Sequence, residues 1–291
     1  MPILSKTELF KILPSEAHDV VFKAHRINEL RRLQGREQTQ SFIDDRGIVS
    51  LFTGTELPSI QEAIEGTLAS DTHDGIIKSG FGIAWIWAQD LPDQSRCMYC
   101  LFLREKATFI ARRHWASLIA MGSPDHHQAR KAKHISAIAY QLANYIETQG
   151  PTSGDLLRKA LGHTGRAGGQ TFRRARRELE KQWIIVPIGI GEHRRGADPH
   201  TWELTGRWLP AHILEEALAL SRQEAMANIL LAGIDATLAV DEQAVFRWFG
   251  WTRSITGRLV KGLLEREACF RVDGSNPILI SQTLVDAWPR V

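Results

Sequence analysis

Apolar residues in the middle of the chain recur at the spacing of helices. Between residues 135 and 146 they return every three or four positions, which predicts one buried helical face. Gly150 and Pro151 are expected to end this helix. Ser153 is a typical N-cap for a short second helix over residues 154–161.

A third helix is expected to begin near Gly169. Phe172, Ala175, Leu179 and Trp183 follow each other at spacings of three or four, so they predict a buried stripe. The arginines of this segment fall off the stripe, on what would be the solvent-facing side of the helix. They are Arg173, Arg174, Arg176 and Arg177.

Two strands are predicted to follow the third helix, over residues 183–190 and 200–204. The turn between them contains Arg194 and Arg195, so the hairpin has a basic tip. Two helices, a basic third helix and a hairpin are the order of a winged helix-turn-helix. We therefore predict such a motif from Lys133 to Leu209.

The same order is predicted again after Ser221. A long helix, a short helix, a basic helix beginning near Thr252 and two strands follow one another to the end of the chain. Arg253, Arg258 and Lys261 decorate the third of these helices. The pattern predicts a second motif that is less basic than the first.

The first 130 residues predict a mixture of helices and strands. Helices are expected over residues 16–34, 41–45 and 58–66, and strands over residues 48–52, 81–88, 97–103 and 107–111. In the strand expected at 81–88, Trp85 and Trp87 would share one face. The fold class is thus α+β, mainly α: tandem winged helix-turn-helix domains at 126–212 and 213–291 behind an N-terminal α+β block at 1–125.

Charge is concentrated in one segment of the chain. The whole sequence of 291 residues has a formal net charge of only +3, but residues 166–181 hold six basic and two acidic residues. A basic helix in a winged helix-turn-helix favours double-stranded DNA as the partner. Nothing in the sequence predicts a signal peptide or a membrane span, and the three cysteines suit a reducing compartment, so a cytoplasmic protein is expected.

Neither a metal site nor a cofactor is predicted. Cys97 and Cys100 would point to opposite faces of a strand, which favours core packing over zinc binding. His126 and His127 are adjacent in what is expected to be an exposed basic linker, and neighbouring histidines there are poor co-ligands. The sequence does not indicate an oligomeric state.

Several segments resemble the AlkZ-related proteins, relatives of the winged-helix DNA glycosylases AlkZ and YcaQ. The resemblance extends from about Phe42 to the C-terminus. It rests on FIDDRGIVSLF, ELPSIQEAIEG, IAWIWAQDLP, CMYCLFLREKATFIARR and GHTGRAGGQTFRRARRELEKQWIIVPIG. It implies tandem winged-helix domains, with the N-terminal block as a third, and removal of alkylated bases or opening of interstrand crosslinks.

The resemblance also implies a Gln-x-Gln or Gln-x-Asp motif that positions the attacking water. The strand where that motif is expected holds Ser50 and Phe52 instead. A Gln-x-Gln does occur upstream, at Gln38 and Gln40. Gln38, Gln40 and Ser50 are therefore the candidate catalytic residues, Asp44 and Asp45, or Asp90, are further candidates for a general base, and catalysis stays open.

Two functions are consistent with these patterns. The first is a DNA glycosylase-like protein of DNA repair, and the second is a non-enzymatic winged-helix transcriptional regulator that reads one operator. Both would use the same DNA-binding residues. These are Arg166, Gly168, Gly169, Arg173, Arg174, Arg177, Arg194, Arg195, Arg253, Arg258 and Lys261.

Overall fold

The computed structural model describes residues 3–68, 80–89, 91–92, 96–190 and 200–286. It is a mixed α+β structure, mainly helical, with three small antiparallel sheets among the described residues. The chain forms two compact units. Unit 1 comprises Met1–Ala88, Leu101–His114 and Met226–Val291, and unit 2 comprises Gln89–Cys100 and Trp115–Ala225.

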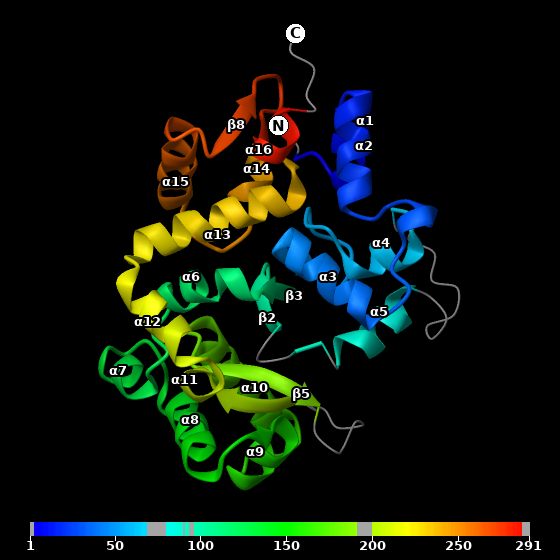
Figure 1. Ribbon diagram of the computed structural model, residues 1–291. Helices are drawn as coiled ribbons and strands as arrows, with labels where there is room; N and C mark the ends of the chain where they lie inside the picture. The colour runs from blue at the N-terminus through cyan, green and yellow to red at the C-terminus, as the bar shows by residue number, and fades with distance from the viewer. Residues whose placement is uncertain (1–2, 69–79, 90, 93–95, 191–199, 287–291) are drawn as a thin grey trace. The chain divides into compact units, whose positions relative to one another are not determined.

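In unit 2, residues 137–204 form three helices and a three-stranded sheet, in a fixed order along the chain (Figure 1). The sheet order is β4-β6-β5, so the last strand lies in the middle. The elements are α8 (Ala137–Gln149), β4 (Thr152–Ser153), α9 (Gly154–Ala160), α10 (Gly165–Lys181), β5 (Ile185–Ile190) and β6 (His200–Leu204).

The same order occurs at both ends of the chain, with equivalent sheet orders β7-β9-β8 and β1-β3-β2. The C-terminal elements are α13 (Arg222–Thr237), β7 (Ala239–Asp241), α14 (Glu242–Val245), α15 (Arg253–Glu265), β8 (Cys269–Val272) and β9 (Ile278–Ser281). The N-terminal elements are α3 (Arg36–Arg46), β1 (Ile48–Ser50), α4 (Ile60–Glu65), α5 (Gly80–Ala88), β2 (Cys97–Leu103) and β3 (Lys106–Ala111).

Short helices make up the remaining regular structure of the described residues. They are α1 (Lys6–Ile12), α2 (Ser15–Ala24), η1 (Glu29–Arg31), η2 (Arg112–His114), α6 (Trp115–Ala120), α7 (His126–Lys131), α11 (Thr205–Trp208), α12 (Ala211–Ala219) and α16 (Gln282–Val285). None of the described helices combines the length and the apolar composition that crossing a bilayer requires.

The prediction for residues 81–88 was wrong in both of its parts. The strand predicted over residues 81–88 is the helix α5, and its buried face includes Gly80, Ala84 and Ala88, which are four residues apart. The aromatic content favoured a strand, but small residues at helical spacing decided the packing. Trp85 and Trp87 therefore do not share a face, because residues two apart on a helix point about 200° away from each other.

The predicted helices and strands of the central segment are present, with ends that differ by a few residues. Helix α10 begins at Gly165 and not near Gly169. Its buried Phe172, Ala175 and Leu179 belong to one core with Leu142 and Ile146 of α8 and with side chains of β5 and β6. The stripe read from the sequence is thus the face that holds α10 against α8 and the sheet.

The N-terminal helices α1 and α2 pack against C-terminal elements within unit 1. Leu9, Phe10, Ala17 and Val21 lie in one buried cluster with β7, β9 and α16. The backbone N–H of Leu4 donates to the carboxylate of Asp241 at 2.7 Å. Elements from the two ends of the sequence therefore share one core, which no local pattern indicated.

A buried ion pair joins α1 to α4. Nζ of Lys6 lies 2.5 Å from Oε2 of Glu62, and the two side chains are only 11% and 7% exposed. Nζ also donates to the carbonyl of Leu57 at 3.2 Å, and Ser59 Oγ donates to the Glu62 carboxylate at 2.9 Å. Every described polar contact at this ion pair is made within unit 1. The ion pair therefore fastens α1 to α4.

Two histidines of unit 1 have pKa values that folding lowers. His25 is buried, with Nε2 3.1 Å from the carbonyl of Ala236, and burial holds its pKa well below the usual range, with a smaller effect from Lys6. Burial, reinforced by Arg113, lowers the pKa of His114 to about 4. Both side chains are thus neutral in the folded protein at pH 7.

We expect the free energy of unfolding to fall as the pH drops below about 6.5, the unfolded value for histidine. The unfolded chain then binds more protons than the folded one, so each histidine contributes a loss of up to about 1.4 kcal/mol per pH unit. Urea unfolding at pH 7.0 and 5.5 measures this loss. The variants H25Q and H114Q should each show a shallower fall than the wild type.

Candidate nucleic-acid interface

Helix α10 presents a cationic face to solvent in unit 2. Its apolar stripe is buried in the core, so the opposite side of the helix is exposed. The exposed basic residues on α10 include Arg166, Arg173, Arg174 and Arg177. Arg166, Arg173 and Arg177 are separated by seven and four residues, so they lie on one face and can approach one ligand together.

Arg176 is not part of this face. Its guanidinium lies 4.9 Å from the ring centroid of Trp202, and its Nε is 3.4 Å from Oε2 of Glu180. Trp202 is buried on β6, so Arg176 packs against the sheet. Arg176 was not among the predicted DNA-binding residues, and the partner it packs against, Trp202, could not be identified from the sequence.

Gly168 and Gly169 lie inside α10 rather than at its start. The backbone N–H groups without a helical partner are those of the first turn, from Thr164 to Ala167. A Cβ at Gly168 would lie 2.6 Å from the backbone carbon of His163, so this glycine allows a close backbone approach. Gly169 is buried. That either glycine contacts DNA stays a prediction.

Arg194 and Arg195, predicted at the tip of the hairpin, lie outside the described residues. The strands on either side, β5 and β6, are paired antiparallel from Ile185 opposite Leu204 to Ile190 opposite His200. The two strands predicted for the hairpin are therefore present and paired.

The third helix of the C-terminal set, α15, carries the other predicted basic residues in unit 1. Arg253, Arg258 and Lys261 are all exposed. Arg253 donates to Gln243 Oε1 at 2.9 Å and lies 4.9 Å from the ring centroid of Phe246, and Lys261 pairs with Glu265 at 3.6 Å. Local partners offset part of this positive charge, in agreement with the weaker basic pattern in the sequence.

A cationic cavity in unit 1 was not predicted from the sequence. Its volume is about 580 Å³, and its lining contains five basic residues and one acidic residue, Asp45. The basic residues are Lys23, Arg26, Arg31, Arg32 and Arg46. They come from α2, η1, α3 and the turns between them, so the adjacent Arg31 and Arg32 were the only local signal in the sequence.

Burial and a second cation both disfavour the charge on one arginine of this cavity, Arg46. Desolvation lowers the pKa of Arg46, and the neighbouring Arg113 lowers it further, whereas Asp45 opposes the shift. Arg113 donates to the backbone carbonyls of Asp44 and Asp45 at the end of α3. Positive charge gathered around a concave surface is suited to phosphate groups.

The candidate catalytic glutamines do not converge. Both lie on α3, where residues two apart leave the helix on different sides. Gln38 is exposed, accepts a hydrogen bond from the backbone N–H of Gln34 at 3.0 Å, and lines the cationic cavity. Gln40 is buried and donates to Asp44 Oδ1 at 3.1 Å. They cannot hold one water between them as a pair on a strand would.

Ser50, the third catalytic candidate, is buried on β1. Its hydroxyl donates to the carbonyl of Phe52 at 2.6 Å, and its backbone N–H donates to the carbonyl of Pro58. The side chain thus has a partner within its own loop. Of the three catalytic candidates, Gln38 is the one that lines the cationic cavity. Asp90, a further candidate for a general base, lies outside the described residues.

Comparison with known proteins gives one family and one fold. A family model described as AlkZ related matches residues 33–250. No curated protein matches the sequence. Among solved structures, the Streptomyces sahachiroi DNA glycosylase AlkZ is similar, with a TM-score of 0.54 and 10% sequence identity over 94% of this chain and 72% of that one.

Proposed function

Since the chain belongs to the AlkZ-related family, we propose that it binds double-stranded DNA through tandem winged-helix motifs. One observation carries the proposal. The order of three helices and three strands, with the last strand in the middle of the sheet, occurs three times in the described residues. That order is the plan of a winged helix, in which the third helix enters the major groove.

Helix α10 is the best candidate for the helix that contacts DNA. It is the third helix of the central set, its apolar face is fixed in the core, and its exposed face carries arginines at helical spacing. Guanidinium groups bind phosphate oxygens and guanine edges well, because their fork of donors matches both. α15 would make the equivalent contact in the C-terminal set with a less basic face.

The cationic cavity of unit 1 would bind the DNA backbone. Five basic side chains against one carboxylate favour phosphates, and they disfavour a positively charged alkylated base in the same place. Base release is our second candidate function, favoured by the presence of Gln38 and Asp45 in one cavity lining, where they would act on the sugar beside the bound phosphates while the cationic base lies outside the cavity. A carboxamide and a carboxylate are the groups that orient and activate a water.

Base release has a direct test. Duplex DNA carrying methylated purines is incubated with the protein, and abasic sites are then cleaved with alkali and counted. The variants Q38A and D45N should each lower the rate at least about 100-fold, the range for loss of a general base or of a group that orients its water. Q40A should lower stability without this specific loss, because Gln40 is buried away from the cavity lining.

No abasic sites in duplexes that the protein binds would exclude the glycosylase activity and leave the DNA-binding proposal intact. A footprint at one defined sequence would then favour a transcriptional regulator. Binding that ignores sequence but prefers damaged duplex would favour a DNA-repair role. Absence of DNA binding altogether would contradict the main proposal.

A further inference from the structure

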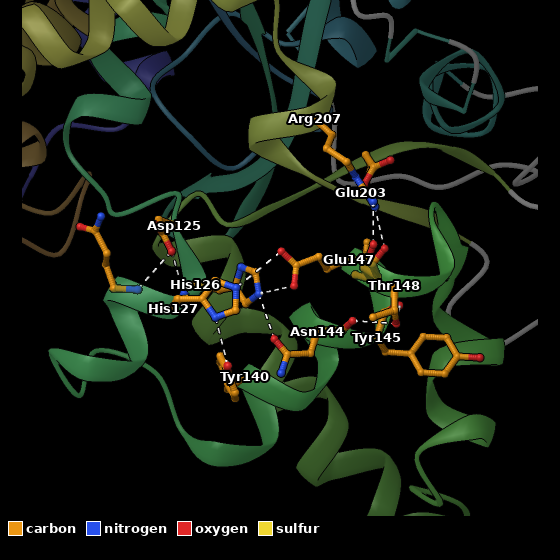
Figure 2. Close-up of polar contacts among 12 residues, drawn as sticks. Asp125, His126, His127, Tyr140, Asn144, Tyr145, Glu147, Thr148, Glu203 and Arg207 are labelled. Atoms are coloured by element: carbon orange, nitrogen blue, oxygen red, sulfur yellow. Dashed lines mark hydrogen bonds and ion pairs between the residues drawn. The ribbon is translucent and has the colours of Figure 1, made fainter.

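Two adjacent histidines on α7 face one carboxylate on α8 in unit 2 (Figure 2). His126 and His127 occupy the first turn of α7. On α8, Tyr140, Asn144 and Glu147 follow one another at spacings of four and three, so they lie on one face of that helix, toward α7. The histidines are thus part of a helix pair and not of an extended linker.

The donor atoms have the separations of metal ligands. Nε2 of His126 lies 3.5 Å from Oε2 of Glu147, and Nε2 of His127 lies 3.5 Å from Oε1. Each of the three residues offers one ligand atom within 4.8 Å of the others. Ligands about 2.0–2.1 Å from a tetrahedral zinc ion are about 3.3–3.4 Å apart, so small side-chain movements would complete the geometry.

A hydrogen bond to Tyr140 orients the ring of His127 so that its other nitrogen can bind a metal ion. Nδ1 of His127 lies 3.0 Å from the hydroxyl of Tyr140. When Nδ1–H donates to that hydroxyl, the lone pair of Nε2 points toward Glu147, as in metal sites where the second ring nitrogen is held by an outer partner. Nε2 of His126 lies 3.0 Å from Asn144 Oδ1, a bond that a metal ion would replace.

The backbone on both sides of the cluster is fixed. The carboxylate of Asp125 caps α7, accepting from the N–H groups of His127 and Gln128 at 2.8 and 3.1 Å. The carbonyl of Glu147 accepts from Arg207 Nη1 at 2.9 Å, and Arg207 pairs with Glu203 at 2.6 Å. Ligands held in this way lose little conformational entropy when an ion binds.

We propose that His126, His127 and Glu147 form a binding site for a divalent transition-metal ion, zinc in the first place, which fastens α7 to α8. Two imidazoles and a carboxylate are a ligand set suited to zinc. The His126 side chain is only 5% exposed, whereas those of His127 and Glu147 are 51% and 44% exposed. The fourth position is therefore on the solvent side and open to water.

No metal was predicted here from the sequence, because the two histidines were expected to lie in an exposed linker. The structure changes that premise, since both are helical and one is buried. The competing explanation is that protonated histidines form plain ion pairs with Glu147. The two explanations differ in what happens when a metal is added.

The test uses the full chain after removal of metals with a chelator. We expect ZnCl₂ to bind with one ion per chain in titration calorimetry and to raise the melting temperature. CoCl₂ should give the visible absorption of four-coordinate cobalt. H127Q and E147Q should each weaken zinc binding more than about 100-fold, since loss of an outer partner alone costs about 10–100-fold. Y140F should show that smaller loss.

H134Q is the matched control, because His134 is exposed in the same unit and lies outside the cluster. It should bind zinc as the wild type does, and circular dichroism should show that all variants remain folded. The proposal is overturned if the wild type shows no saturable zinc binding, or if binding of unchanged affinity survives in E147Q or H127Q.

Discussion

Replacing Arg173 and Arg177 of α10 together with Ala should weaken binding of duplex DNA by about 10–100-fold at about 0.15 M salt. Both are exposed four residues apart on the face opposite the core stripe, so one phosphate backbone can meet both. Each phosphate that a side chain neutralises adds about 0.9 to the steepness of log affinity against log salt. Without two such side chains the slope should become shallower by about 2, which fluorescence anisotropy at several salt concentrations measures.

The matched control removes the same charge elsewhere in unit 2. Lys131 and Arg222 are exposed on other helices, α7 and α13. The variant K131A/R222A has the same net charge as R173A/R177A, so any effect of total charge is common to both. If the two variants bind DNA equally well, the assignment of α10 as the contacting helix is wrong.

The variant K6M should lower the free energy of unfolding by about 3–5 kcal/mol. It leaves the carboxylate of Glu62, only 7% exposed, without the ammonium group 2.5 Å away. A buried charge deprived of its partner retains its desolvation cost, which is why removal of one partner is so destabilising. Urea unfolding at pH 7 measures the change.

A double variant separates the ion pair from simple packing. K6M/E62M replaces both charges by apolar chains of similar length, and it should recover most of the loss, since buried pairs and apolar replacements are often equivalent. K261M breaks an exposed pair, with side chains 77% and 63% accessible, and should cost less than about 1 kcal/mol. A double variant no more stable than K6M would show that the ion pair itself is not what stabilises α1.

Local sequence patterns were sufficient to predict an element where one of its faces was strongly apolar. The α8 stripe, the α10 stripe and the hairpin after it were predicted because their spacing repeats over several turns or alternates cleanly. They failed at α5, whose aromatic residues favour a strand although its packing face is made of Gly80, Ala84 and Ala88. Small residues contribute little to a hydrophobic pattern, so their helical spacing was not recognised.

The resemblance to the AlkZ-related proteins was confirmed by the family match, but it did not identify a catalytic pair. The Gln-x-Gln spacing of Gln38 and Gln40 has a different meaning on a helix and on a strand. Residues two apart in the sequence share one face of a strand, but on a helix their side chains point to different sides. The secondary structure of that segment therefore decided whether the two carboxamides could act together.

By itself the sequence determined the helical order of the central segment, the basic stripe of α10 and the family, because these depend on residues close together in the chain. Only the tertiary structure decided which arginine turns inward to Trp202, which basic residues surround one cavity, and that His126 and His127 face Glu147. The physical reason is that each depends on the rotation of a helix about its axis and on contacts between elements, and apolar burial over the whole fold sets both.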